Sequence, residues 1–319
     1  MVLGKFMPLH QGHELLLNFA ANFCDQLHVV TDWQAAIDGE RRCKWIRETV
    51  PQAEVFYLDK PHPQTPEEHP DFWGIWQRSL LGAMPEKPDY VFASEQYGLK
   101  LAEVLGAKFI PFDIKRESIS ISATKIRDDL FAGWDYLSTA AKRDYLARIC
   151  IFGPESCGKS TLAEQLAAHF STCFVPEYAR LFIETRGDPK KEDMLHIAKG
   201  QAALEKAMVA RANRYLFCDT DPLTTTIWSR WHFGSASEEL LKLAQKNTYG
   251  LYLLMDAGLP WKKDAVRYFP DKGKEFLADC IETLEKYNRP YFIVRGQGKE
   301  RLNNAIRVIE AERKNLFRI

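Results

Sequence analysis

Two short segments of this chain have the residue types that bind nucleotide phosphates. One is the sequence GPESCGKS at Gly153–Ser160, which directly follows the apolar run Arg148–Phe152. The other is HQGH at His10–His13, which follows the strand-like run Val2–Met7 near the N-terminus. Two sites of ATP type on one chain of 319 residues predict a bifunctional enzyme.

The GxxxxGKS segment is typical of a P-loop. Such a loop wraps phosphates with successive backbone N–H groups, and the N-terminus of the helix that follows favours negative charge. Lys159 would reach the β- and γ-phosphates of ATP, and the Ser160 hydroxyl would bind Mg²⁺. The preceding strand and the following amphipathic helix disfavour the alternative, an ordinary glycine-rich turn. The other loop residues expected to contact ATP are Gly153, Glu155, Ser156, Cys157, Gly158 and Thr161.

Cys157 leaves two alternatives open. It lies near a helix N-terminus and close to Lys159, surroundings that favour a reactive thiolate. It could equally be a small filler residue with an inert thiol.

Carboxylates follow two of the apolar runs, at the sheet edge where ligands bind. Asp219 closes the run at 215–218 and suits Mg²⁺, whereas Asp221 in the same Asp-Thr-Asp-Pro sequence suits a helix N-cap. Glu177 could accept a proton from an attacking hydroxyl while Arg180 holds an anion or the substrate. The alternative is a helix first turn, where glutamate is favourable through the helix dipole alone.

The segment Pro260–Arg267 is rich in charge and follows another strand-like run. This composition fits a mobile lid that brings Arg267 to the transferring phosphoryl group. A solvated loop is the alternative, and the sequence does not separate the two.

The HxGH segment places two imidazoles at the start of a helix, and its glycine lets the backbone approach a phosphate. Such a pair can stabilise the charge that grows on a nucleotide α-phosphate when pyrophosphate leaves. The segment Ile119–Arg127, ISISATKIR, combines serine and threonine at a helix start with Lys125 and Arg127 one turn later, a second anion site. Each segment alone also fits helix capping, but the two together favour nucleotidyl transfer.

These segments need a scaffold in which short apolar runs alternate with amphipathic helices, the pattern of a parallel sheet. The expected strands are Val2–Met7, Leu27–Thr31, Glu54–Leu58, Tyr90–Ala93, Lys108–Phe112, Arg148–Phe152, Cys173–Val175, Tyr215–Cys218, Leu251–Met255 and Tyr291–Val294. The expected helices are Gly12–Phe23, Arg41–Val50, Phe72–Met84, Lys159–Phe170, Asp193–Arg211, Ser237–Lys246, Lys274–Tyr287 and Glu300–Arg313. Four prolines within residues 60–70 predict a surface loop.

The fold class predicted from this pattern is α/β, with two doubly wound parallel-sheet domains. Residues 1–142 would form a Rossmann-like nucleotidyltransferase, and residues 143–319 a P-loop kinase. The polar helical stretch around residues 138–147 separates the two series of elements.

Composition narrows the function classes further. The 43 Lys and Arg residues balance 43 Asp and Glu residues, so the zero net charge argues against a nucleic-acid binder. The seven cysteines include no CxxC pair and suggest neither a disulfide framework nor a zinc site. With no signal peptide and no apolar stretch of membrane length, we expect a reduced, soluble, cytoplasmic protein without membrane contact.

The motifs together resemble a known family. Gly4-Lys5-Phe6, the HQGH segment and ISATKIR at 121–127 resemble the GKF, HxGH and ISxTxxR motifs of nicotinamide mononucleotide adenylyltransferases. Joined to a P-loop domain with EYxR, DTD and PWxxDxxR elements, the chain resembles the bifunctional NadR family over nearly its whole length. That family couples a ribosylnicotinamide kinase to a nicotinamide mononucleotide adenylyltransferase.

The resemblance implies roles for particular residues. In the first half it implies that ATP is bound by Lys5, Phe6, His10, Gly12, His13, Thr124 and Arg127, with His10 and His13 catalytic. Trp73 or Trp76 would stack on the nicotinamide ring; because they are three residues apart on one helix face, helix core is the alternative. In the second half it implies catalytic roles for Lys159, Glu177 and Arg267, ATP–Mg²⁺ binding by Ser160 and Asp219, and substrate contacts from Tyr178, Arg180, Trp261 and Asp264.

The implied function is NAD salvage with Mg²⁺ as cofactor and ATP as co-substrate. Nicotinamide riboside would be phosphorylated to nicotinamide mononucleotide, which a second ATP would convert to NAD and pyrophosphate. The alternative is a ribosylnicotinamide kinase whose N-terminal domain is a catalytically weak nucleotide-sensing module. A homo-oligomer is compatible with the sequence.

The chain departs from the family pattern in two places. A strand is expected from residue 2, which leaves no room for the N-terminal helix-turn-helix domain of many members. Ala265 stands where the lid pattern usually has glycine.

Overall fold

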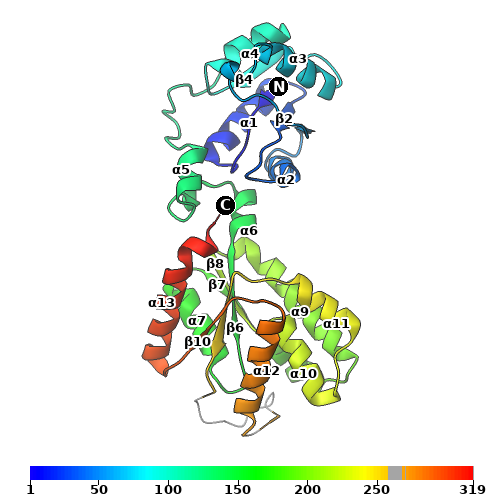
Figure 1. Cartoon of the computed structure of the whole chain (residues 1–319), viewed down its shortest axis with the longest axis vertical. Helices are drawn as coiled ribbons and strands as arrows, with labels where there is room; N and C mark the ends of the chain where they lie inside the picture. The colour runs from blue at the N-terminus through cyan, green and yellow to red at the C-terminus, as the bar shows by residue number, and fades with distance from the viewer. Residues whose placement is uncertain (258–267, 270, 319) are drawn as a thin grey trace. The chain divides into compact units, whose positions relative to one another are not determined.

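The structure, a computed structural model, describes residues 1–257, 268–269 and 271–318. The chain divides into two compact units, Met1–Asp144 and Tyr145–Arg318, each with its own sheet (Figure 1). The border expected between residues 142 and 143 falls within helix α6 (Thr139–Tyr145). Among the described residues, no helix is both long and apolar enough to cross a membrane.

The N-terminal unit is a doubly wound α/β domain with five parallel strands in the order β3-β2-β1-β4-β5. Its strands are β1 (Val2–Leu3), β2 (His28–Asp32), β3 (Glu54–Leu58), β4 (Tyr90–Ala93) and β5 (Lys108–Pro111). Its other helices are α1 (Gln11–Phe23), α2 (Gly39–Thr49), α3 (Phe72–Ala83), α4 (Tyr97–Leu105) and α5 (Ala123–Asp128). Because the strand order reverses between β1 and β4, their carboxyl ends flank the crevice where such sheets bind ligands.

The C-terminal unit has the same kind of sheet, with five parallel strands in the order β10-β9-β6-β8-β7. Its strands are β6 (Ala147–Phe152), β7 (Cys173–Val175), β8 (Tyr215–Asp219), β9 (Leu251–Met255) and β10 (Tyr291–Val294). Its helices are α7 (Lys159–His169), α8 (Tyr178–Arg186), α9 (Asp193–Met208), α10 (Pro222–Phe233), α11 (Glu238–Lys246), α12 (Gly273–Lys286) and α13 (Gly298–Leu316). The central strand β6 therefore delivers the GPESCGKS loop between β8 and β9.

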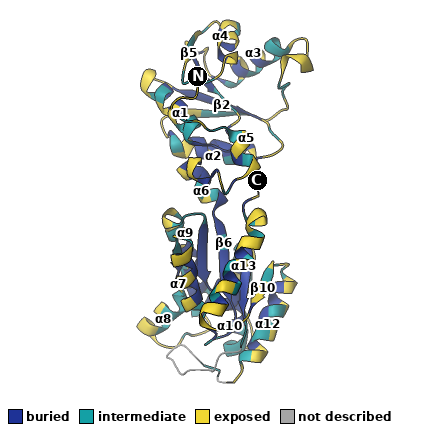
Figure 2. Cartoon of the chain, turned by 90° about the vertical axis from the view of Figure 1, so that its left-hand side faces the viewer, coloured by how far each residue is buried: buried dark blue, intermediate teal, exposed yellow. Residues whose placement is uncertain are grey.

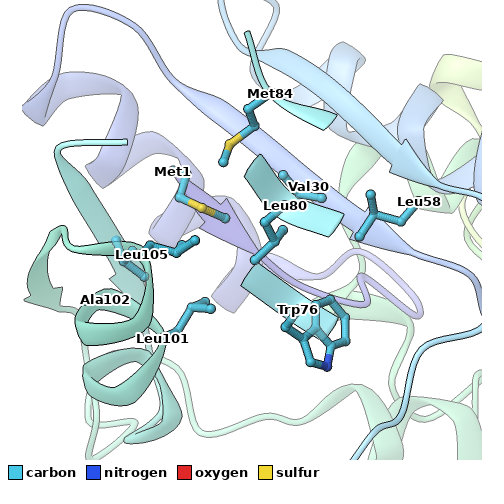
Figure 3. Packing of buried hydrophobic residues seen from close by; sticks show 10 residues of the cluster. Met1, Val30, Leu58, Trp76, Leu80, Met84, Leu101, Ala102 and Leu105 are labelled. Carbon is cyan, nitrogen blue, oxygen red and sulfur yellow. The ribbon is translucent and has the colours of Figure 1, made fainter. Parts of the chain in front are cut away.

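Each sheet forms the core of its unit. Strands β2, β8 and β9 are buried at every position, as expected where helices cover both faces of a parallel sheet. The helices expose their outer faces (Figure 2). In the N-terminal unit, side chains of α3 and α4 pack with Met1 and Val30 into one apolar cluster (Figure 3). The predicted α/β class is confirmed, and a strand is present at each of the ten predicted places. The first strand is shorter than predicted: it ends at Leu3, and Met7 belongs to a turn.

Helix α4 was not predicted, and neither were the lengths of α8 and α10. The predicted helix N-cap at Asp221 is confirmed as the start of α10, and a helix first turn was the alternative for Glu177, which precedes α8. Helix α10, with the sequence PLTTTIWSRWHF, is rich in β-branched and aromatic residues, which have low helix propensity. It forms because Asp221 caps its N-terminus, Pro222 occupies its first position, and it packs against α9, α11 and α12. The proline-rich segment at 60–70 is a loop with one short 3₁₀ turn, Pro66–Glu68, as predicted.

Candidate functional site

The N-terminal unit contains a cavity of about 650 Å³ at the carboxyl ends of β1 and β4. It brings together all the residues that were predicted to bind nucleotide in this half of the chain. Those residues are Lys5, Phe6, His10, Gly12, His13, Trp73, Trp76, Thr124 and Arg127. The sequence motifs, more than 100 positions apart, therefore meet around one space.

His10 and His13 form a stacked pair at the start of α1, with ring centroids 3.8 Å apart and planes inclined by 24°. His10 is the N-cap of α1, and its Nδ1 accepts a hydrogen bond from the Gly12 backbone N–H at 3.1 Å. A ring nitrogen that accepts carries no hydrogen, so neutral His10 holds its hydrogen on Nε2. The second nitrogen of His10 is consequently a hydrogen-bond donor.

Burial keeps both histidines neutral at physiological pH. Burial, followed by repulsion from Arg116, lowers the pKa of His10 to about 4. Burial and the neighbouring His10 lower the pKa of His13 well below its ordinary value. An arriving polyphosphate would raise both pKa values, because negative charge nearby favours the imidazolium form. The pair is therefore suited to respond to negative charge in the cavity.

Helix α5 carries the second segment that was predicted to bind an anion. Ser122 caps it, with its Oγ accepting from the Lys125 N–H at 3.3 Å. Arg127 donates from Nη1 to the Met7 carbonyl at 2.5 Å and from Nη2 to the Thr124 hydroxyl at 3.0 Å. Because Met7 belongs to the loop after β1, Arg127 connects the two predicted motifs directly.

A buried arginine outside the predicted motifs also holds the loop after β1 in place. Arg42, on α2, is fully buried and donates to the Lys5 carbonyl at 2.7 Å and to the Asp32 carbonyl at 2.6 Å. It also donates to the Thr31 hydroxyl and the Ile37 carbonyl. A buried guanidinium is stable only with its donors satisfied, and here they hold the carboxyl ends of β1 and β2 together. The charged residues around it in sequence are typical of a solvated helix face.

Trp73 and Trp76 both lie on α3 and line the cavity, but their surroundings differ. Trp76 is 7% exposed, packs in the apolar cluster of Figure 3, and donates from Nε1 to the Pro63 carbonyl at 2.9 Å. Trp73 is half-buried, with its ring edge-to-face on Phe72 at 5.0 Å. Trp76 is thus a core residue, and Trp73 is the more accessible candidate for a stacking platform.

The GPESCGKS loop of the C-terminal unit joins β6 to α7 in a conformation that requires glycine. Gly153 and Gly158 have φ values of +139° and +86°, a region that side chains rarely adopt. A Cβ at Gly153 would also lie 3.1 Å from the carbonyl oxygen of Met255 on β9. The loop ends at Lys159, the first residue of α7, whose free N–H groups can bind an anion.

Lys159, Glu177 and Asp219 form one charged cluster beside this loop. Burial lowers the pKa of Lys159, but Cys157, followed by Glu177 and Asp219, outweighs it and raises that pKa. Burial, followed by repulsion from Asp219, raises the pKa of Glu177 to about 7. Burial also raises the pKa of Asp219, against the opposing effects of Lys159 and a hydrogen bond from Ser160. The ammonium of Lys159 donates to the Pro154 carbonyl at 2.7 Å.

The two aspartates of the DTD sequence have different surroundings. Asp221 is the N-cap of α10: it accepts from the Thr224 N–H at 2.8 Å and from the Tyr252 hydroxyl at 3.0 Å. Asp219 is 1% exposed, and its Oδ1 has no hydrogen-bond partner. A buried carboxylate oxygen without a partner is unfavourable unless a cation binds it. Asp221 is therefore structural, and Asp219 fits a metal site.

Magnesium is the metal that suits this arrangement. Within residues 1–257, 268–269 and 271–318, no three His, Cys, Asp or Glu side chains converge as a complete metal site. Mg²⁺ does not need one, because it binds one or two protein oxygens and takes its remaining ligands from water and substrate phosphates. Ser160 and Asp219, already in contact with each other, fit that pattern.

A smaller pocket of about 60 Å³ is lined by Glu177, by Arg180 and by Thr220, the residue after Asp219. Glu177 precedes α8 but makes no capping hydrogen bond with its side chain, so its placement is not explained by helix capping. Tyr178 does not line the pocket; its backbone N–H donates to Gln201 at 2.8 Å.

Three aromatic residues line the same pocket and were not predicted from the sequence: Trp228, His232 and Tyr268. The first two lie four residues apart on α10, a helix whose start was predicted at Asp221 but whose length was not. Their i, i+4 spacing places them on one face of that helix. The pocket thus combines a carboxylate, a guanidinium and aromatic rings.

Some predicted residues of this half stand apart from both pockets. The Glu155 carboxylate accepts hydrogen bonds from the backbone N–H groups of Tyr268 and Phe269. Thr161 is exposed at the start of α7. The three predicted lid residues Trp261, Asp264 and Arg267 lie outside the described residues.

The structure separates the two alternatives for Cys157. Its side chain is 2% exposed, and its thiol donates to the Pro154 carbonyl at 2.9 Å. Burial raises the pKa of this thiol, although Lys159 opposes the shift. The structure therefore favours the alternative of a small filler residue with an inert thiol, because burial outweighs the nearby positive charge.

Comparisons with known proteins give matches in both units. A family described as an AAA domain matches residues 148–301. The trifunctional NAD biosynthesis/regulator protein NadR of Escherichia coli (strain K12) is 30% identical over 313 residues, covering 90% of this chain and 76% of that protein. The protein of the same name from Salmonella typhimurium is 29% identical, with the same coverage.

Solved structures agree with these matches at the level of the fold. A NadR protein in complex with NR has a TM-score of 0.76 and 20% identity, covering 97% of this chain and 94% of that one. A NadR protein in complex with NAD and AMP-PNP has a TM-score of 0.77 and 21% identity, covering 97% and 95%. From the identity and coverage of the Escherichia coli relative, the chain belongs to the NadR family.

Proposed function

We propose that this protein makes NAD from nicotinamide riboside in two steps, one in each unit. The observation that carries the proposal is that each unit has its own phosphate loop, after the central strand of its own sheet, with different chemical groups around it. The names of the relatives specify NAD biosynthesis, and the solved NadR structures contain NR, NAD and AMP-PNP.

In the C-terminal unit, the 5′-hydroxyl of nicotinamide riboside would attack the γ-phosphorus of ATP and release ADP. Glu177 would accept the hydroxyl proton, since a pKa of about 7 suits a general base at neutral pH. Lys159 would balance the charge on the transferring phosphoryl group. Ser160 and Asp219 would hold Mg²⁺, which when bound neutralises charge on the ATP phosphates.

The small pocket would form only part of the riboside site, because about 60 Å³ is less than the volume of the whole molecule. The pyridinium ring of the riboside is positively charged, and aromatic rings such as those of Trp228 and Tyr268, which line the pocket, favour a cation through their π electrons. The carboxylate of Glu177 adds negative charge to the lining, and the guanidinium of Arg180 adds positive charge. A neutral ring of similar size would gain less from the aromatic side chains.

In the N-terminal unit, a phosphate oxygen of nicotinamide mononucleotide would attack the α-phosphorus of a second ATP. The bond to the β-phosphate breaks, and pyrophosphate leaves with its electrons. His10 and His13 would donate hydrogen bonds to the phosphate oxygens as their charge grows, and Thr124 and Arg127 would hold the triphosphate. Trp73 would stack on the nicotinamide ring.

The test follows every product of one incubation. Protein, ATP, Mg²⁺ and nicotinamide riboside should give nicotinamide mononucleotide first and NAD later, with one ADP and one pyrophosphate released per NAD. If added mononucleotide yielded no NAD and no pyrophosphate while the riboside was still phosphorylated, the N-terminal unit would be a sensing module. If the riboside were not phosphorylated, the kinase assignment would be wrong.

A further inference from the structure

Glu155, inside the phosphate loop, binds the backbone of a segment far away in the sequence. Its Oε2 accepts from the Tyr268 N–H at 2.9 Å, and its Oε1 accepts from the Phe269 N–H at 2.8 Å. Hydrogen bonds from N–H groups to a carboxylate are about twice as strong as neutral ones. Both carboxylate oxygens are therefore engaged in holding one backbone segment.

The segment held by Glu155 forms part of the smaller pocket, the one proposed for the riboside. The Tyr268 ring lines the pocket and lies edge-to-face against His232 at 4.8 Å. The Tyr268 hydroxyl donates to Asp188 Oδ1 at 2.8 Å. The next residue, Phe269, stacks on Trp228 with ring centroids 5.9 Å apart and planes inclined by 20°.

These contacts hold the side chains of Tyr268 and Phe269, whereas Glu155 holds their backbone. Apart from the bonds to Glu155, the described contacts of Tyr268 and Phe269 are side-chain contacts and one turn hydrogen bond, from the Lys272 N–H to the Phe269 carbonyl. The backbone position of Tyr268 is therefore fixed in part by the phosphate loop.

We infer that Glu155 is a positioning residue for the proposed riboside site. It holds the aromatic residues that line this site against the ATP loop. This inference rests on the proposed kinase reaction for its effect on catalysis. A carboxylate directed at ATP would repel the polyphosphate, whereas one whose two oxygens bind N–H groups has its charge stabilised. The P-loop pattern predicted an ATP contact at this position, and the two roles give opposite kinetic results.

The first measurement needs no substrate. Glu155→Gln keeps the size of the side chain but replaces one acceptor oxygen with an NH₂ group that cannot accept from an N–H. Hydrogen exchange at the Tyr268 and Phe269 amides should become roughly 10-fold faster, while the amides of α12 should not change. Glu164→Gln, at an exposed position of α7, makes the same change of charge and should leave both amides unaffected.

The second measurement separates the two substrates of the kinase. In Glu155→Gln, the KM for nicotinamide riboside should rise roughly 10-fold, with the KM for ATP nearly unchanged. Tyr268→Phe keeps the ring but loses the hydrogen bond to Asp188, so it should raise the riboside KM by a smaller factor. Glu155→Asp retains both acceptor oxygens and should recover part of the loss.

Two results would overturn the inference. Unchanged exchange at Tyr268 and Phe269 in Glu155→Gln would show that the carboxylate does not hold the segment. A raised KM for ATP with an unchanged riboside KM would show that Glu155 contacts ATP. If the wild-type protein does not phosphorylate the riboside, the proposed function fails. The exchange experiment would still test whether Glu155 holds the Tyr268–Phe269 backbone.

Discussion

In both units the predicted phosphate loop follows the central strand of a parallel sheet. The two histidines beside this loop are neutral in the N-terminal unit, whereas the side chains beside it in the C-terminal unit are charged. In the N-terminal unit the groups at the helix start are His10 and His13, both neutral because burial lowers their pKa values. In the C-terminal unit the loop ends in Lys159, whose pKa is raised by the acidic groups around it. In the proposed reactions the sheet would therefore set where phosphates bind, and the side chains would determine which bond is broken.

The difference corresponds to the two proposed reactions. Transfer of a γ-phosphoryl group needs a base for the acceptor and ligands for a metal, so carboxylates such as Glu177 and Asp219 must lie close to the phosphates. Their negative charge in turn requires the permanent cation of Lys159. Nucleotidyl transfer uses an acceptor that is already an anion, so hydrogen-bond donors suffice and a carboxylate base is unnecessary.

The largest expected effect is the loss of one activity while the other is retained. Lys159→Ala should reduce riboside phosphorylation roughly 10³-fold, because it removes the cation that balances the transferring phosphoryl group. Adenylylation of added mononucleotide should continue at its normal rate, since that site belongs to a different core. Lys274→Ala, which removes an exposed lysine of α12, is the matched control and should change neither rate. A folded Lys159→Ala protein that had lost both activities would contradict the two-site arrangement.

The next effect tests the neutral state of the histidine pair. The pKa of His10 is lowered from an ordinary value of 6.5 to about 4. Between these values the unfolded chain binds a proton that the folded chain excludes, so the free energy of unfolding should decrease as pH falls from about 6.5 to about 4. The decrease attributable to His10 should be roughly 3 kcal/mol.

His10→Gln isolates this contribution, because glutamine can still accept from the Gly12 N–H but does not titrate. The free energies of unfolding of wild type and variant can be measured by chemical denaturation at a series of pH values. The two values should converge or cross as the pH falls. A difference that stayed constant across this range would mean that His10 is not held neutral by burial.

The third effect asks whether the neutral pair is catalytic. His13→Ala should slow adenylylation of the mononucleotide roughly 10²-fold, the usual cost of removing one donor that stabilises developing charge. Riboside phosphorylation should be unaffected in the same preparation. An equal loss of both activities, or an adenylylation rate close to normal, would remove His13 from the proposed mechanism.

Sequence patterns were most informative where function depends on short local segments. The strand–loop–helix order, the glycines at 153 and 158, and the HxGH and ISATKIR segments are all local, and the residues predicted for the N-terminal unit line one cavity. The inner strands β2, β8 and β9 were recognisable because a parallel sheet buries all their positions and leaves continuous apolar runs.

Residues that act through distant contacts were missed. Arg42 resembles a surface residue in sequence, and only the packing of α2 onto β2 and β3 makes it a buried donor to the Lys5 and Asp32 carbonyls. Trp228 and His232 lie on a helix with poor intrinsic propensity, so their common face was not recognised. Glu155 was read from the loop pattern alone, whereas its partners are more than 100 residues away.

The smallest expected effect concerns the two tryptophans of α3, which the sequence could not distinguish. Trp73→Ala should weaken mononucleotide binding by roughly 1 kcal/mol, because it removes an accessible ring from the cavity, and should leave ATP binding to this unit nearly unchanged. Trp76→Ala should instead lower the melting temperature, because Trp76 fills the apolar cluster and bonds the Pro63 carbonyl. Calorimetric titration with each ligand, together with thermal unfolding of both variants, measures the two effects separately. If Trp73→Ala lowered stability and weakened both ligands equally, Trp73 would also belong to the core, and the stacking platform would have to be sought elsewhere on the cavity wall.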